Sequence, residues 1–419
     1  MGARLSAKVW HPFTQMKGFE ARGRVVQAQG AWLTFADGHR AVDGISSWWV
    51  NTHGHAHPKI AEAIAEQARR FDQVILADFS HAPAEQLSAT LADLLPGDLR
   101  HIFYSDNGST SVEVALKMAM QAQHNLGQPQ KRKFVAFTGA YHGDTVGAMS
   151  VGERGVFNEP FWDLLFDSTV LPYGDAQALR DHLTQHADEV AGVIMEPLVQ
   201  GAAGMVFSSP DYLRECRGIC DEFGVYLILD EVMTGWGRTG TLFACEQAGI
   251  APDLIAASKG VTGGTLPLGV TGCTDAIYQA FLGEKKTDAF LHGHSYTGNP
   301  IACAAANAAL SLYDEEGTLQ RIAGMESQYC AAAPLFIDLE GVENVRQRGS
   351  IFAFELSSEV GGYLDPIGRR VSDRTFPMGL YSRPLGNTLY LMPPFCLSEA
   401  ELDRCLDQLF EATRAELLT

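Results

Sequence analysis

The sequence predicts an α/β protein with a large, mostly parallel sheet and a smaller α+β domain. Three observations indicate this fold. From about residue 56 to 300, short apolar runs alternate with helical stretches, which is typical of a doubly wound sheet. The apolar run at 225–229 is followed by Asp230, and the run at 254–258 is followed by Lys259. The chain of 419 residues is long enough for two or three domains.

The elements follow in chain order. Residues 1–55 alternate aromatic runs with turn signals and predict a short meander. Buried strands are expected at 102–105, 134–137, 192–196, 225–230 and 254–258. An alanine-rich segment at 301–312 predicts a long helix that leaves the sheet domain. Beyond it we expect helices at 317–340 and 398–417, and strands near 350–356 and 388–392.

This pattern predicts the domain organisation. The N-terminal segment, 1–55, is expected to join the small domain. Residues 56–314 form the large domain in this prediction, and residues 315–419 form the C-terminal small domain. No internal repeat, linker tract or low-complexity region interrupts the sequence.

Composition and charge exclude several classes of partner and location. The 31 basic and 50 acidic residues give a net charge of −19, which argues against nucleic acid and anionic membranes as partners. The eight cysteines form no C-x-x-C pair and are typical of a reducing compartment. No apolar stretch reaches the ~18 residues of a membrane span, and no signal peptide is recognisable. We expect a cytoplasmic protein and regard the loose myristoylation pattern at 2–6 as a chance match.

Asp230 and Lys259 are the first candidate functional residues. In open α/β sheets, groups at the carboxyl ends of the strands line the ligand crevice. A lysine and an aspartate there suit pyridoxal phosphate (PLP), because the lysine can hold the carbonyl as a Schiff base and the aspartate can pair with the pyridinium nitrogen. A structural ion pair is the alternative that the spacing alone leaves open.

The neighbouring motifs favour the cofactor. The segment at 230–240, DEVMTGWGRTG, resembles the aspartate block of the class III aminotransferases, and SKG at 258–260 followed by TGG at 262–264 resembles their lysine block. Further segments are similar to one subfamily, the 7,8-diaminopelargonate aminotransferases of biotin synthesis: HPFTQM at 11–16, GISSWW at 44–49, YHGDT at 141–145, HGHSYTGN at 292–299 and Arg383-Pro384. The resemblance covers nearly the whole chain. It implies the PLP-dependent transferase fold type I and a homodimer with shared active sites.

The resemblance also implies roles for residues around the cofactor. Lys259 would hold PLP and later move a proton, Asp230 would bond the pyridine nitrogen, and Tyr141 would stack on the ring above Val232. The turn after residue 105 has a glycine and hydroxyls at a helix start, which can bind an anion, although such a turn alone is also an ordinary helix cap. In the family this turn holds the phosphate. The other implied cofactor residues are Gly108, Ser109, His142, His294 and Ser295, the last reaching the phosphate from the partner subunit.

The substrate site is also inferred from the resemblance. Arg383 would clamp the substrate carboxylate with its planar guanidinium group, and Trp48 would lie against the aliphatic chain. Tyr141 and Gly293 would lie beside the substrate. Phe13 replaces the tyrosine that many family members using S-adenosylmethionine have at this position. The histidines at 53, 55 and 57 have the spacing of metal ligands on a strand, but the segment aligns with a non-metal loop of the family, so we expect no metal.

These observations together predict an aminotransferase that converts 7-keto-8-aminopelargonate to 7,8-diaminopelargonate by a PLP ping-pong reaction. The amino donor is S-adenosylmethionine or lysine. The principal alternative is an ω-amino acid or diamine aminotransferase of the same class. An aminomutase or decarboxylase on the same scaffold, and a non-catalytic dimeric partner, are two further alternatives.

Overall fold

A seven-stranded sheet is the centre of the protein. In the computed structural model, which describes residues 8–155 and 157–418, the strand order is β4-β12-β11-β10-β7-β5-β6. The strands are β4 (His101–Ser105), β5 (Lys133–Phe137), β6 (Thr169–Leu171), β7 (Val190–Met195), β10 (Tyr226–Asp230), β11 (Leu254–Ala257) and β12 (Gly269–Cys273). The predicted α/β fold is confirmed. The myristoylation-like segment at 2–6 lies outside the described residues.

Of the two strands of this sheet that the sequence analysis did not predict, β6 is a short edge strand and the longer one is β12. It runs antiparallel to both of its neighbours, β11 and β4, whereas the other pairs in the sheet are parallel. Its sequence, GVTGC, is completely buried but contains two glycines and a threonine. The apolar signal that identifies β7 and β11 is therefore weak in this strand.

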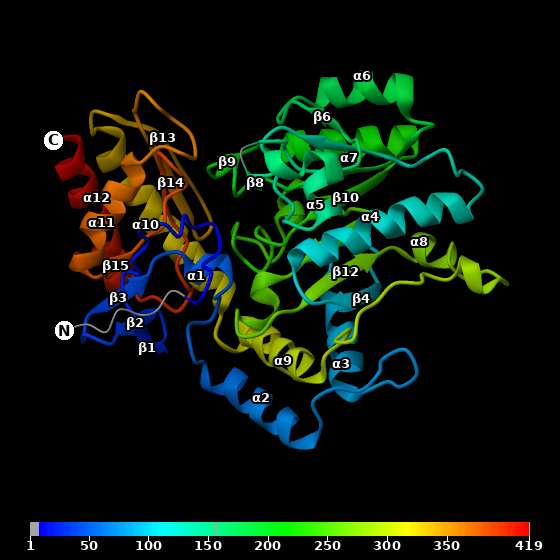
Figure 1. Cartoon of the computed structure of the whole chain (residues 1–419), viewed down its shortest axis with the longest axis horizontal. Coiled ribbons are helices and arrows are strands. Elements are labelled where there is room, and N and C mark those ends of the chain that lie inside the picture. Colours follow the sequence, from blue (N-terminus) through cyan, green and yellow to red (C-terminus); the bar gives the residue numbers. More distant parts are fainter. Residues whose placement is uncertain (1–7, 156, 419) are drawn as a thin grey trace.

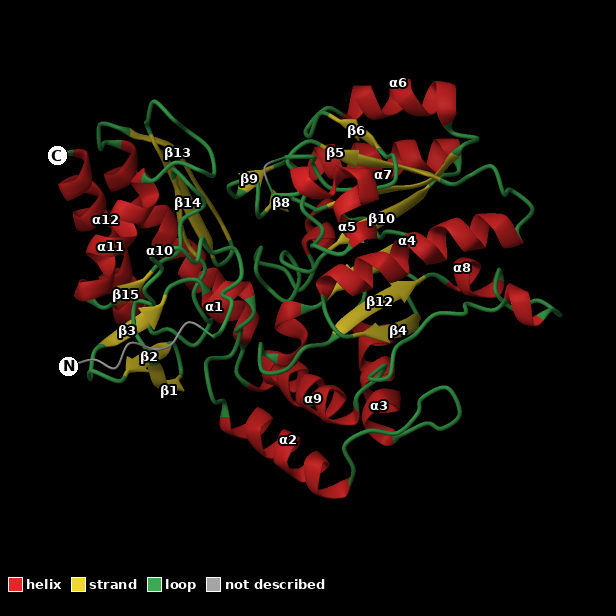
Figure 2. Ribbon diagram, in the orientation of Figure 1, coloured by secondary structure: helices red, strands yellow, loops and turns green. Residues whose placement is uncertain are grey.

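Helices cover both faces of the sheet (Figure 2). Ile228 packs with α4 residues on one face, while Leu227 and Leu229 pack with α6 and α7 residues on the other. The alternation follows from the two-residue period of a strand, and burial on both faces explains why β10 is apolar throughout. The helices of this part of the chain are α2 (Pro58–Arg70), α3 (Ala82–Leu94), α4 (Gly108–Asn125), α5 (Val146–Ser150), α6 (Ala176–His186), α7 (Pro210–Phe223), α8 (Asp275–Gln279) and α9 (Pro300–Glu315).

The N-terminal strands and the C-terminal elements lie on the same side of the molecule, away from the seven-stranded sheet (Figure 1). β1 (Val25–Gln29), β2 (Trp32–Phe35) and β3 (Arg40–Asp43) form the predicted meander. β3 pairs in parallel with β15 (Leu380–Tyr381). This pairing supports the proposal that residues 1–55 and 315–419 form one small domain, whose boundaries remain a prediction.

The remaining C-terminal elements form a second core. β13 (Val342–Arg348), β14 (Ile351–Leu356) and β16 (Thr388–Leu391) form an antiparallel sheet. α10 (Thr318–Ile337) and α12 (Glu399–Leu417) occupy the helical segments expected from the sequence, and α11 (Ile367–Met378) was not predicted. Apolar residues of these three helices pack on the sheet in one cluster.

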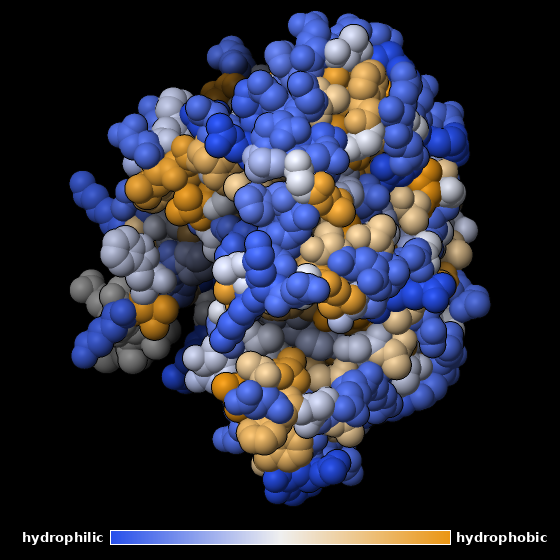
Figure 3. Space-filling model, turned by 90° about the vertical axis from the view of Figure 1, so that its right-hand side faces the viewer, coloured by the Kyte–Doolittle hydropathy of each residue, from blue (hydrophilic) through white to orange (hydrophobic). Residues whose placement is uncertain are grey.

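The face shown in Figure 3 is mostly hydrophilic, with separate hydrophobic patches. No helix in the described ranges is sufficiently long and apolar to cross a membrane.

Candidate active site

The sequence-predicted cofactor residues converge on one cavity. It has a volume of about 680 Å³ and lies where β4, β5, β10 and β11 end. Parallel strands bring the residues that follow them to the same edge of a sheet. The predicted residues that line this cavity are Gly108, Ser109, Tyr141, His142, Asp230, Val232 and Lys259.

Lys259 is held in a strained position at the edge of this cavity. Its φ angle of 46° lies in the left-handed region, which is costly for a residue with a side chain and is common at functional sites. Burial lowers the pKa of the Lys259 amine, and the Asp230 and Glu196 carboxylates oppose this shift. The amine lies 5.3 Å from the ring centroid of Trp49. A lowered pKa favours the neutral amine, which is the form that can attack a carbonyl.

Asp230 has both carboxylate oxygens fixed. Oδ2 lies 2.7 Å from Nδ1 of His142, and Oδ1 accepts a hydrogen bond of 3.0 Å from the backbone N–H of Val232. The aspartate is buried, at 4% exposure. His142 and Val232 therefore orient a buried carboxylate toward the cavity, as a partner for a protonated ring nitrogen must be oriented.

An anion cup lies at the N-terminus of α4. The Asn107 side chain caps the helix by accepting from the N–H of Thr110, and the helix dipole favours negative charge there. In the described part of the chain, the N–H groups of Gly108 and Ser109 have no protein acceptor. The Ser109 hydroxyl lies 2.7 Å from that of Thr145. A Cβ atom at position 108 would come within 2.5 Å of Val232, so this close approach requires glycine.

Two further carboxylates are buried near the end of the sheet. Glu196 accepts from the N–H groups of Tyr141 and Gly201, at 3.2 and 2.9 Å. Glu231 accepts from Thr234 and from the N–H groups of Ala244 and Cys245. Glu231 therefore points away from the cavity into a structural network, as its neighbouring position on the strand predicts.

Glu231 makes stability depend on pH in a defined direction. Burial raises the pKa of Glu231 from 4.5 to about 7. Between these values the folded state holds a proton that the unfolded state releases, so the free energy of unfolding falls as the pH rises. One such group contributes a slope of at most about 1.4 kcal/mol per pH unit. We expect Glu231→Gln to flatten this slope in denaturant titrations at pH 5, 6 and 7. An unchanged slope would contradict the buried proton.

The predicted substrate residues form a second group beside the cavity. The Arg383 guanidinium lies 4.7 Å from the ring centroid of Trp48, and the Phe13 ring packs edge-on against Trp48 at 5.4 Å. A cation stacked on an aromatic ring keeps its N–H edge free for a carboxylate. The structure thus brings Phe13, Trp48 and Arg383 together.

A strained turn places Trp48 in this group. Ser46, Ser47 and Trp49 have φ angles of 52°, 62° and 67°. The Ser46 hydroxyl donates to the carbonyl of Met392, and the Ser47 hydroxyl donates to buried Asp43, each at 2.7 Å. These bonds hold an unfavourable backbone conformation in place.

Three predicted residues lie elsewhere in the single chain. Gly293, His294 and Ser295 do not line the cavity. The backbone carbonyl of Ser295 accepts from Gln73 at 3.0 Å, and a Cβ atom at position 293 would meet little but open space. The roles expected of these three residues stay predictions.

The histidine run has structural partners. His55 pairs with Asp43 at 2.9 Å, and His57 pairs with Glu316 at 3.0 Å. The His53 ring packs edge-on against Tyr313. Each ring therefore has a packing or hydrogen-bond partner in the fold.

Some site residues were missed by the sequence analysis. Trp49 and Thr145 line the cavity, and both belong to motifs noted in the sequence. Arg238, in the aspartate block, is buried and donates to the carbonyls of Asn51 and Pro393, at 2.7 and 3.0 Å. It fixes the N-terminal and C-terminal segments beside the site. Only its place in the motif could have identified it.

Comparison with known proteins identifies the family. The aminotransferase class-III family matches residues 19–413. The chain belongs to the class III aminotransferases. An adenosylmethionine-8-amino-7-oxononanoate aminotransferase of Synechococcus elongatus is 51% identical, over 94% of this chain and 95% of that protein. A protein of the same name from Geobacter sulfurreducens is 40% identical, over 96% of this chain and 94% of its own length.

Solved structures agree with this class III assignment. The crystal structure of adenosylmethionine-8-amino-7-oxononanoate aminotransferase from Methanocaldococcus jannaschii has a TM-score of 0.93 and 36% identity, with 97% of each chain covered. An amine transaminase from an uncultivated Pseudomonas species, in the PLP-bound form, has a TM-score of 0.92 and 31% identity, with 99% of each chain covered.

This class III aminotransferase uses PLP. The donor set fits the cofactor: a lysine amine with a lowered pKa, a buried and oriented aspartate, and unpaired N–H groups at a helix start. PLP, when bound, supplies the electron sink that stabilises negative charge at the reacting carbon.

Proposed function

We propose that this enzyme transfers an amino group to 7-keto-8-aminopelargonate, giving 7,8-diaminopelargonate in biotin synthesis, with S-adenosylmethionine as the amino donor. The observation that carries the proposal is the Arg383 guanidinium stacked on Trp48 at 4.7 Å. A carboxylate clamp on an apolar wall suits an acceptor that has a long aliphatic chain ending in a carboxylate. The names of the relatives that are 51% and 40% identical support the same substrates.

The chain's own groups have distinct roles in this proposal. The Lys259 amine holds the cofactor and then carries a proton to and from the reacting carbon. Asp230, oriented by His142, keeps a proton on the ring nitrogen. Tyr141 and Val232, which line the cavity, would pack against the ring.

The phosphate and the substrate have separate anchors. The N–H groups of Gly108 and Ser109 bind the phosphate as hydrogen-bond donors at a helix N-terminus. Arg383 binds the acceptor carboxylate, and Phe13 and Trp48 exclude water from its chain.

The proposal includes a homodimer. Gly293, His294 and Ser295 lie on a segment that does not reach the cavity of its own chain. On the same segment, Leu291 and Tyr296 expose 67% and 64% of their surface. A partner subunit would cover these side chains and receive Ser295 at its phosphate cup. The eight cysteines, which form no disulfide, support a reducing, cytoplasmic location for this dimer.

The direct test is to mix the holoenzyme with S-adenosylmethionine and, separately, with lysine. We expect S-adenosylmethionine to convert the visible absorbance of the bound cofactor to that of pyridoxamine phosphate, and 7-keto-8-aminopelargonate to reverse the change. Conversion by lysine alone would overturn the assigned donor. Conversion only by ω-amino acids or simple amines would support an amine transaminase instead, which is the activity in the name of the 31% identical Pseudomonas structure.

Arg383→Ala is expected to raise the KM for 7-keto-8-aminopelargonate about 10- to 100-fold, because a charge-assisted hydrogen-bond pair is lost. The rate of the donor half-reaction should change little. Arg383→Lys should recover only part of the loss, because an ammonium cannot form the two-point contact. Equal losses in both half-reactions would place Arg383 outside the acceptor site.

A further inference from the structure

A second cavity adjoins the cofactor cavity and has no role in the reaction as described so far. We call it the acidic chamber; its walls come from residues 139–155 and 157–158, residues 202–206 and the small-domain segments at 355, 362–363 and 385–388. Its volume of about 500 Å³ is typical of small-molecule pockets. Both cavities are lined by residues 141–144, so they share one wall beside the reacting centre.

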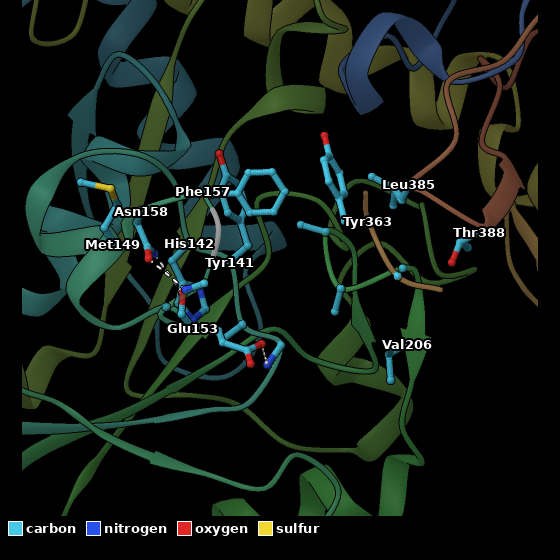
Figure 4. A pocket seen from close by; sticks show the side chains of 18 of the residues that line it. Tyr141, His142, Met149, Glu153, Phe157, Asn158, Val206, Tyr363, Leu385 and Thr388 are labelled. Carbon is cyan, nitrogen blue, oxygen red and sulfur yellow. Dashed lines mark hydrogen bonds between the residues drawn. The ribbon is translucent and has the colours of Figure 1, made fainter. Parts of the chain in front are cut away.

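The chamber has an aromatic wall. The Phe157 and Tyr363 rings pack edge-to-face with centroids 4.4 Å apart, and Figure 4 shows them above Glu153, with Thr388 to their right. Phe157 also contacts Phe13 at 6.2 Å, and Phe13 contacts Trp48. A continuous line of aromatic rings therefore connects the chamber with the arginine clamp.

The polar lining of the chamber is negative. Its charged side chains are Asp144, Glu153 and Glu355, and no lysine or arginine is among its described lining residues. Arg346 pairs with Glu355 at 2.9 Å. Asp144 and Glu153 have no cationic partner within the described chain; they accept from the Tyr141 hydroxyl and the Gly139 N–H.

The Thr388 side chain adds a hydroxyl to the chamber. Thr388 stands at the start of β16, and its hydroxyl makes no hydrogen bond with the described residues, so it is free to bind a ligand.

The two substrates carry opposite charges at the ends remote from the reacting atom. The acceptor ends in a carboxylate, which suits Arg383. S-adenosylmethionine instead carries a positive sulfonium and a planar purine beyond a short methylene spacer. In a ping-pong reaction both molecules react in turn at the same centre, so their remote ends need different surroundings. A positive end would be repelled by Arg383 and attracted by Asp144 and Glu153.

We propose that the acidic chamber binds the sulfonium nucleoside end of the amino donor, with Glu153 and Asp144 facing the cation and Phe157 and Tyr363 forming a wall for the purine. This inference rests on the proposed function. The acceptor does not enter the chamber, because its remote end is anionic.

Two unreactive probes distinguish recognition of the sulfonium charge from recognition of the nucleoside shape. The dimethylsulfonium derivative of 5′-deoxyadenosine and its neutral relative 5′-methylthioadenosine share the nucleoside and lack an amino group. We expect the cation to bind the wild-type holoenzyme at least about threefold more tightly in calorimetry, and the preference to fall about two- to fivefold in Glu153→Gln. Glutamine keeps an acceptor for the Gly139 N–H, so this change removes only the charge.

Matched variants then compare donor with acceptor. Phe157→Ala is expected to raise the KM for S-adenosylmethionine about three- to tenfold and to leave the KM for 7-keto-8-aminopelargonate nearly unchanged. Glu159→Gln is the control, since Glu159 is exposed on the same segment but does not line the chamber.

The outcomes are distinguishable from failure of the proposed function. If S-adenosylmethionine does not convert the wild-type cofactor, the proposed donor is wrong. If it does, but Glu153→Gln and Phe157→Ala behave like Glu159→Gln, or weaken donor and acceptor equally, the chamber is not the donor subsite. If lysine is the donor and its KM responds to Glu153→Gln but not to Phe157→Ala, the chamber recognises an ammonium and the nucleoside assignment is overturned.

Discussion

Replacing Lys259 with alanine is expected to abolish turnover and the visible absorbance of covalently held PLP. Among the described residues that line the cavity, the Lys259 amine is the only group that can both bond the cofactor's carbonyl and carry a proton, so no neighbour can substitute. PLP should still bind through the anion cup and Asp230, and release its free aldehyde on denaturation. The measurements are the absorbance spectrum of the dialysed protein and steady-state turnover.

Lys133→Ala is the matched control for this substitution. Lys133 lies at the start of β5, is exposed and pairs with Glu189. The substitution removes the same type of side chain without touching the cavity, and both signals should persist. Survival of either signal in Lys259→Ala would exclude Lys259 as the cofactor's anchor.

Asp230→Asn should reduce the rate of the donor half-reaction by at least about a hundredfold while cofactor remains bound. An amide cannot stabilise a proton on the ring nitrogen as a carboxylate does, and loss of one preorganised electrostatic contact commonly costs a factor of about 10² to 10³. The His142 ring at 2.7 Å would also lose its anionic partner. Stopped-flow absorbance after mixing with S-adenosylmethionine measures this rate.

Glu231→Gln separates a catalytic loss from a structural one. Glu231 is buried like Asp230 and is adjacent to it in sequence. Its carboxylate, however, accepts hydrogen bonds from Thr234, Ala244 and Cys245. Its substitution should change stability and leave the half-reaction rate within a fewfold of wild type. If both variants slow the reaction equally, Asp230 acts only through the fold.

The central sheet and the cofactor cavity were largely predictable. The strands before Asp230 and Lys259 are apolar because both faces are buried, and parallel strands deliver the residues that follow them to one edge. An aspartate and a lysine at the carboxyl ends of two strands therefore predicted a shared site, and both residues line the cavity. The glycine and hydroxyl residues after residue 105 also predicted the anion cup at Gly108 and Ser109.

Features built from distant segments could not be predicted. The left-handed turn at residues 46–49 depends on Met392, and the acidic chamber joins Glu153 to Tyr363 and Thr388. Contacts between segments so far apart in the chain produce no recognisable pattern in the local sequence. β12 was missed for another reason. Gly269 packs closely against Ser105 and Asn107, and Gly272 packs closely against Leu95 and Ile255, so glycine is needed at both positions although it weakens the apolar signal.

The reversed strand β12 has a consequence for the order of assembly. β4 is an edge strand that pairs with β12 in the sheet. Residues 101–105 can therefore join the sheet only after residues 269–273 have been synthesised and positioned. β5, β6, β7 and β10 need no such late partner, because they pair among themselves. Since pairing between distant segments is slow, the anion cup that follows β4 is expected to become rigid last. By then the segment that carries Lys259 would already be part of the partly folded sheet. Cofactor capture would then coincide with the closing step of folding.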